Sequence, residues 1–171
     1  MSGVVTLEPW EVEWAHAVGL RRHYANAAKG DAAYYDPSLM EDNIRASRAA
    51  ACAEMAVAKF LNRFWSGSVW DSALHDRYKG IIDDVSGGYE VRRTRKRDGS
   101  LVVRSKDVDK KSKIVLTYPA PPNFEEVRII GWLPADIAWD LGTPAPYDKA
   151  GTTRLVDQEN LWPLTKIASP L

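Results

Sequence analysis

Acidic and basic residues lie close together in the segment DDVSGGYEVRRT, residues 83–94. Asp83 and Asp84 precede a glycine pair, and Glu90 and Arg92 follow one residue apart. Alternate side chains of a β-strand share a face, so Glu90 and Arg92 would point the same way. Carboxylates beside a cation could hold Mg²⁺ and a phosphate group, because Mg²⁺ takes oxygen ligands and activates water. The same residues would also fit a hairpin with a solvated ion pair.

A further carboxylate lies on a predicted helix over residues 38–65. This stretch contains no glycine and no internal proline, as expected for a long helix. Its second half carries one stripe at spacings of three and four, formed by Ala50, Glu54, Val57, Leu61 and Phe64. A carboxylate on an apolar stripe is costly without a partner, so Glu54 is either a functional acid or a solvated residue at the edge of the stripe.

The remaining pattern predicts the elements that would position these side chains. We expect a first amphipathic helix over residues 6–30, with Thr6 in a capping pattern. Glycine pairs and Asp-Gly favour hairpin turns at residues 87–88 and 98–99. Strands are predicted at 80–85, 89–96, 101–106, 113–118 and 127–134, and a short helix at 135–142. Together these form one α/β (α+β) domain with a mixed or antiparallel sheet.

The 171-residue chain is long enough for one domain with its own core. We divide it into an N-terminal helix and loop (1–37), a core (38–140) and a turn-rich tail (141–171). The single cysteine excludes a disulfide framework within one chain. No 18 apolar residues run together and no signal peptide is seen, so we expect a cytoplasmic protein without a membrane partner.

Charge is balanced overall but not along the chain. Lysine plus arginine and aspartate plus glutamate both number 23, yet residues 91–113 hold ten basic and three acidic residues, a local net charge of +7. Clustered lysine and arginine are typical of surfaces that bind a phosphate backbone. The candidate nucleic-acid contacts are Arg93, Arg95, Lys96, Arg97, Arg104, Lys110 and Lys111. Alternatively, these basic residues form the solvated face of a hairpin and bind no nucleic acid.

The chain resembles the PD-(D/E)XK nuclease-like superfamily in the order of its charged residues. A helix glutamate (Glu54) is followed by a strand aspartate (Asp84) and then by Glu-x-Arg (Glu90 and Arg92). The restriction-endonuclease-like core of that superfamily is a central mixed sheet flanked by helices. More specifically, four segments are similar to small proteins of tailed bacteriophages and actinobacteria placed in that superfamily. These segments are AEMAVAKFLNRFW, DDVSGGYEVRRT, LVVRSKDVDKKSKIVL and VRIIGWLPADIA. The resemblance covers roughly residues 46–140. If the chain is phage-encoded, the compartment is the host cytoplasm.

The resemblance implies a Mg²⁺- or Mn²⁺-dependent DNA nuclease. Catalytic roles fall on Glu54, Asp84, Glu90 and Arg92, and the first three would be metal ligands. Arg92 stands where the superfamily usually has lysine, and arginine cannot serve as a base, so the metal would have to generate hydroxide. The alternative is a catalytically inactive protein of this fold that binds nucleic acid or a host protein. A homodimer is compatible with either function.

Overall fold

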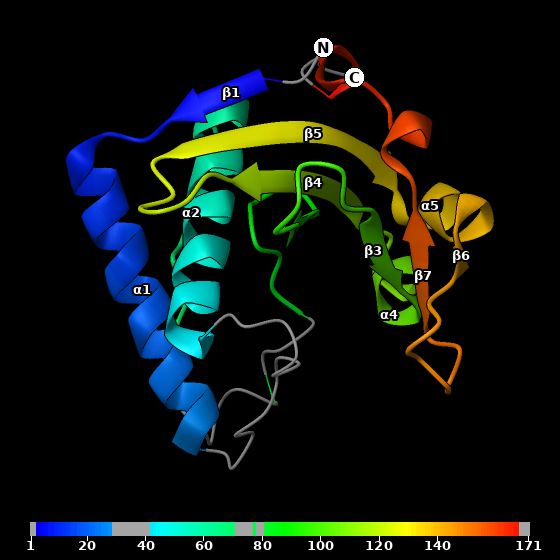
Figure 1. Ribbon diagram of the computed structural model, residues 1–171, viewed down its shortest axis with the longest axis horizontal. Coiled ribbons are helices and arrows are strands. Elements are labelled where there is room, and N and C mark those ends of the chain that lie inside the picture. Colours follow the sequence, from blue (N-terminus) through cyan, green and yellow to red (C-terminus); the bar gives the residue numbers. More distant parts are fainter. Residues whose placement is uncertain (1–2, 29–41, 71–76, 78–80, 168–171) are drawn as a thin grey trace.

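Two packed helices and a four-stranded sheet form the larger part of the molecule (Figure 1). The computed structural model describes residues 3–28, 42–70, 77 and 81–167. Helix α1 spans Pro9–Ala28 and helix α2 spans Asn43–Leu61. The two helices approach closely at Gly19, where a Cβ atom would lie 2.6 Å from the Cα of Arg48. Helix α2 then covers one face of the sheet.

The four-stranded sheet is mixed. Its order is β1-β5-β4-β2, in which β2 and β4 are parallel and the other pairs are antiparallel. The strands are β1 (Gly3–Thr6), β5 (Glu126–Pro134), β4 (Lys113–Pro119) and β2 (Tyr89–Arg93). The result is an α+β fold in which β2 lies at the edge of the sheet.

A second, antiparallel sheet lies at the other end of the molecule from α1 (Figure 1). Its order is β3-β7-β6, with β3 at Leu101–Arg104, β7 at Thr153–Val156 and β6 at Thr143–Pro144. Two short α-helices, α4 (Ser105–Asp109) and α5 (Ala135–Leu141), and two 3₁₀ turns, η2 (Gln158–Asn160) and η3 (Leu164–Lys166), complete the described elements.

Strand β4 joins two hydrophobic cores. Val115 packs in the core between α2 and the four-stranded sheet, whereas Ile114 and Leu116 pack in a second core with β3, β7 and α5. Because successive side chains of a strand point to opposite faces, β4 is buried on both sides. On the neighbouring strand β2, Tyr89 and Val91 belong to the α2 side, which leaves Glu90 and Arg92 on the other face.

The structure confirms the expected class, a mixed sheet with helices, and most of the predicted elements. The helix predicted over 38–65 ends earlier, at Leu61, where Asn62 adopts a left-handed conformation (φ 52°) as its C-cap. Residues 38–41 lie outside the described ranges. Among the described helices, none combines the length and the apolar character that a membrane span requires.

Three local predictions were wrong. Residues 81–84 form a turn and bend rather than the strand predicted over 80–85, and Val85 makes only an isolated bridge to Tyr89. Residues 98–99 do not join a hairpin, because β2 pairs with β4 while β3 pairs with β7. Thr6 does not cap the first helix but ends β1, which pairs with β5. In each case a partner far away in sequence determines the local structure.

Candidate active site

A cleft with a volume of about 280 Å³ lies beside the edge strand β2. Its walls come from the C-terminal half of α1, the segment 66–70, the turn at 82–84, β2 itself, and α4 with its flanking residues. Three of the four predicted catalytic residues line it, namely Asp84, Glu90 and Arg92. The cleft therefore brings together residues from five separate segments of the chain.

The turn before β2 is held by its two aspartates. Asp83 Oδ2 accepts a hydrogen bond from the amide of Gly88 (3.0 Å), and Asp84 Oδ2 accepts one from the amide of Val91 (2.8 Å). Gly87 and Gly88 have φ values of 100° and 84°, which side chains other than glycine rarely tolerate. The aspartates thus replace strand pairing with side-chain-to-backbone bonds. As a consequence both of them face the cleft.

Glu90 is held between two cations. Its Oε1 accepts a hydrogen bond from Lys110 Nζ at 2.5 Å, and its Oε2 accepts one from Arg92 Nη1 at 3.3 Å. Lys110 Nζ also lies 3.7 Å from Asp83 Oδ1. The lysine therefore occupies the space between two carboxylates of the cleft.

Arg92 bridges three acids of the cleft. Nη1 lies 4.0 Å from Asp84 Oδ2, and Nη2 donates to Asp107 Oδ1 at 2.8 Å. Asp107 is almost fully buried and also accepts from the amide of Arg104, at the start of α4. Burial opposes the charge of Arg92, but Asp107, Asp84 and Glu90 together outweigh it and raise the arginine pKa. Arg92 is consequently a fixed cation at the base of the cleft.

Glu54 occupies a different environment. It lies on α2, which covers the face of β2 opposite to Glu90, and it is not part of the cleft lining. Arg22 of α1 binds it in a bidentate manner (2.7 and 3.0 Å), and Trp65 Nε1 donates to its Oε2 at 2.9 Å. Arg22 itself lines the cleft. Glu54 thus contacts the cleft through its arginine, and its role as a metal ligand stays a prediction.

The charges of both glutamates act on Asp84. Burial, followed by the negative charges of Glu54 and Glu90, raises the pKa of its carboxyl to about 8. Lys106, on the opposite wall, has a lowered pKa because of burial and the charges of Arg104 and Arg92. The cleft therefore holds an acid with a raised pKa, Asp84, and a lysine with a lowered pKa, Lys106.

The donor set fits a hydrated divalent cation at Asp84 and Glu90. Mg²⁺ commonly takes one or two carboxylates and completes its octahedron with water and phosphate oxygens. A bound cation would offset both the burial and the repulsion that raise the Asp84 pKa. Within the described residues no group of three or more His, Cys, Asp or Glu side chains is arranged to hold a metal ion. For Asp84 and Glu90 to hold the cation, Lys110 would have to leave Glu90.

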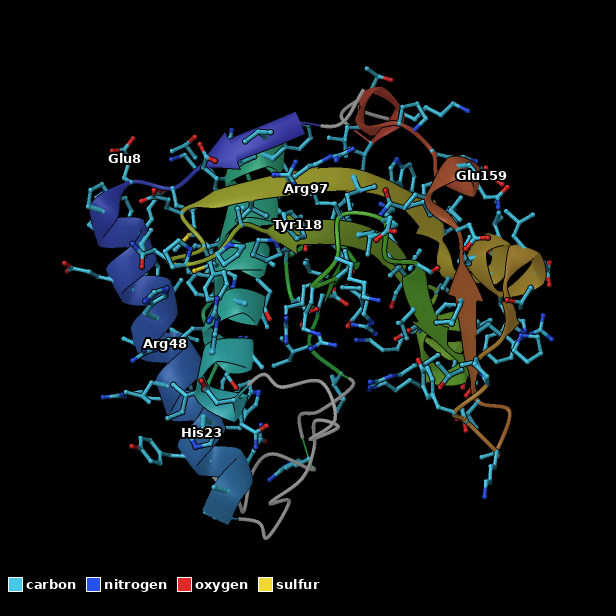
Figure 2. The ribbon with its side chains drawn as sticks, in the orientation of Figure 1. Glu8, His23, Arg48, Arg97, Tyr118 and Glu159 are labelled. Carbon is cyan, nitrogen blue, oxygen red and sulfur yellow. The ribbon has the colours of Figure 1, made fainter. Side chains whose placement is uncertain are left out.

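The seven predicted nucleic-acid contacts are divided by the structure. Arg104 and Lys110 line the cleft, whereas the other five do not. Arg97 is exposed and lies over the ring of Tyr118, 5.9 Å from its centroid (Figure 2). Its loop is tied to the tail, because Gln158 Nε2 donates to the carbonyls of Arg97 and Gly99. For all seven residues, contact with nucleic acid stays a prediction.

None of three comparisons with known proteins finds a match. They covered protein-family models, curated proteins and solved structures. The resemblance to the PD-(D/E)XK superfamily accordingly stays a prediction.

Sequence reasoning missed three residues that shape the cleft: Arg22, Lys106 and Asp107. Arg22 follows Ala15, Val18 and Gly19 on the buried face of α1, so a basic residue on that stripe was a signal for a partner of Glu54. Asp107 lies in a stretch that looks merely polar, and only its distant bond to Arg92 reveals its role.

Proposed function

We propose that the chain is a metal-dependent nuclease of the PD-(D/E)XK type that hydrolyses phosphodiester bonds in DNA. The observation that carries the proposal is the grouping of Asp84, Glu90 and Arg92 in one cleft, with the pKa of Asp84 raised to about 8. Perturbed carboxylates in a cleft are frequent at catalytic sites. The adjoining Arg104, Lys106 and Lys110 supply the positive charge that a phosphate backbone requires.

In this proposal Asp84 and Glu90 would hold Mg²⁺ or Mn²⁺, which supplies a water of lowered pKa and neutralises phosphate charge when bound. Arg92 cannot take up a proton, but its fixed guanidinium can stabilise charge that develops on the phosphate. Lys106, with its lowered pKa, can exchange a proton at its Nζ. Arg22 and Glu54 keep α1 and α2 in place at the far wall.

The alternative is a catalytically inactive protein of the same fold that binds nucleic acid or a host protein. The pairing of charges favours it: Glu54 is satisfied by Arg22 and Trp65, and Glu90 by Lys110 and Arg92. A site that serves only structure or binding would show such internal neutralisation.

The test is cleavage of supercoiled plasmid and linear DNA by purified protein with Mg²⁺ or Mn²⁺, with a chelator control. We expect the wild type to cut and Glu90→Gln to be inactive, because that change removes an anionic metal ligand. Arg92→Ala should cut about 100-fold more slowly, the usual cost of one preorganised donor. Asp109→Asn is the matched control, since this acid is exposed on α4 and does not line the cleft.

An inert wild type with both metals would contradict the nuclease proposal. DNA binding by that inert protein, measured in parallel, would then support the inactive alternative. A parallel series with RNA would establish which nucleic acid is the substrate.

A further inference from the structure

A second concave surface lies on the two helices and shares no lining residue with the cleft. We call it the helix groove, and its volume is about 690 Å³. Its walls are His16 and His23 of α1, residues 42–45 and Arg48 at the start of α2, and residues 122–124 before β5. His23 and Arg48 lie on the same side of the packed helices (Figure 2).

Arg48 enters the groove at the point where the helices cross. Its backbone packs against Gly19, which lies between His16 and His23 on α1. The Nε of Arg48 is buried and has no hydrogen-bond partner among the residues that the structure describes. An unpartnered buried donor costs free energy, and a ligand that accepts from it would remove that cost.

Arg45, one turn earlier, is a second cation of the groove. Its guanidinium lies 5.6 Å from the ring centroid of Phe124. Across the described parts of the chain, neither Arg45 nor Arg48 has a carboxylate oxygen within 4.0 Å. Asp42 is an acid in the lining, but its Oδ1 is bonded to the amide of Arg45 as the N-cap of α2. Residues three apart on a helix are neighbours, so both guanidinium groups can serve one ligand.

The remaining lining adds polar groups that do not cancel this charge. His16 Nε2 donates to the carbonyl of Asn123 at 2.9 Å, and burial lowers the pKa of the ring, with a further contribution from the charge of Arg48. Asn43 and Asn123 also line the groove, and Pro122 and Phe124 provide apolar surface. The groove thus combines two arginines with amides and an apolar wall.

We propose that the helix groove binds a phosphate-class oxyanion through Arg45 and Arg48. Planar guanidinium groups recognise phosphate by paired hydrogen bonds. A volume of about 690 Å³ falls in the range of small-molecule sites. The anion is therefore either the phosphate group of a phosphomonoester, such as a mononucleotide, or free phosphate with water filling the rest of the groove. This binding does not depend on the nuclease proposal.

Isothermal titration calorimetry at low salt tests the site with three probes: inorganic phosphate, adenosine 5′-monophosphate and adenosine. We expect saturable binding of the two phosphate-bearing probes and none of adenosine. Arg45→Gln and Arg48→Gln should each weaken binding at least about tenfold, the effect of one lost charge-assisted bond. The matched control is Arg21→Gln, an exposed arginine of α1 outside both linings.

Tighter binding of the mononucleotide than of phosphate would assign the site to phosphomonoesters, and equal binding would assign it to the free anion. Circular dichroism shows whether each variant is folded, and Arg48→Lys should retain part of the affinity if charge is what matters. The proposal is overturned if neither anion saturates, if adenosine binds as well as its phosphate, or if Arg21→Gln weakens binding as much as Arg48→Gln.

Discussion

The cleft and the helix groove differ in how their cations are paired. In the cleft, three cations contact a carboxylate: Arg22 contacts Glu54, Lys110 contacts Glu90, and Arg92 contacts Asp107. Arg104 and Lys106 also line the cleft, and within the described residues neither has a carboxylate oxygen within 4.0 Å. In the helix groove, Arg45 and Arg48 have no carboxylate partner within the described residues. A ligand that binds Arg22, Arg92 or Lys110 must therefore exchange with their internal partners, whereas a ligand of the groove meets two arginines that no described carboxylate holds.

This difference has consequences for stability as well as for binding. A buried charge that loses its partner is costly, so replacing a paired arginine of the cleft should lower the free energy of unfolding. An unpaired cation contributes little to the folded state, so arginines of the groove should be dispensable for folding and important only for a ligand. Four measurements test this contrast.

The largest expected effect is on the free energy of unfolding. Arg22→Ala leaves Glu54 buried with Trp65 as its remaining described partner, and we expect a loss of about 3 kcal/mol. Arg45→Ala should cost under about 1 kcal/mol, since the described contact of this side chain is the one with the Phe124 ring. Urea denaturation of both variants measures the difference. Equal losses would show that the two regions do not differ in this way.

The next effect concerns pH. The carboxyl of unfolded Asp84 loses its proton near pH 4, but the folded one does so near pH 8. The folded chain therefore binds more protons in this interval, and its stability should fall as pH rises from 4 to 8. Asp84→Asn should remove this loss and stabilise the protein at pH 8 by about 2 kcal/mol. This gain is smaller than the full pKa shift would give, because water still reaches the side chain. At pH 4 the two proteins should be equal.

Thermal unfolding of wild type and Asp84→Asn across this pH range is the measurement. A variant that is less stable than the wild type at pH 8 would mean that the Asp84 bond to the amide of Val91 outweighs the repulsion from Glu54 and Glu90.

A third effect tests competition between Lys110 and a metal ion. Lys110 Nζ lies between Glu90 and Asp83, where it neutralises an acid that a cation would need. Lys110→Met should therefore raise the affinity for Mn²⁺ about tenfold, equivalent to ~1.4 kcal/mol. Calorimetric titration measures this, with the exposed neighbour Lys111→Met as control. Weaker Mn²⁺ binding by Lys110→Met would show that the lysine supports the site instead.

The smallest effect is on the salt dependence of DNA binding. Arg97 and Lys111 are exposed, and alanine at either position should reduce the slope of log K against log salt by up to about one unit if the residue touches a phosphate. Lys110→Ala should change the slope less, because Glu90 already holds that lysine. Fluorescence anisotropy with a labelled duplex measures the slopes. Unchanged slopes for both exposed residues would remove the basic segment from the binding surface.

The sequence was sufficient where local periodicity determines the structure. Helix α2 follows from its helix-forming residues, and the alternation in β2 correctly places Glu90 and Arg92 on one face, opposite Tyr89 and Val91. It was insufficient where pairing is non-local. The second sheet joins β3 to β7, about fifty residues away along the chain, and no turn signal indicates that pairing.

The same division applies to the cleft. The turn at 81–84 looked like a strand because of Ile81 and Ile82, yet both are exposed, and the aspartates after them bind backbone amides. Arg22 and Asp107 reach the cleft through ion pairs with residues 32 and 15 positions away. Such pairs carry no periodic pattern, so only the fold reveals them.

The proposed function requires that Asp84 and Glu90 together hold a divalent cation. The direct test is a crystal soaked in Mn²⁺, with anomalous diffraction recorded to locate the metal. We predict one anomalous peak within coordinating distance of both carboxylates, with Lys110 displaced from Glu90. A crystal in which no peak appears at these carboxylates, and in which Lys110 still contacts Glu90, would contradict the account.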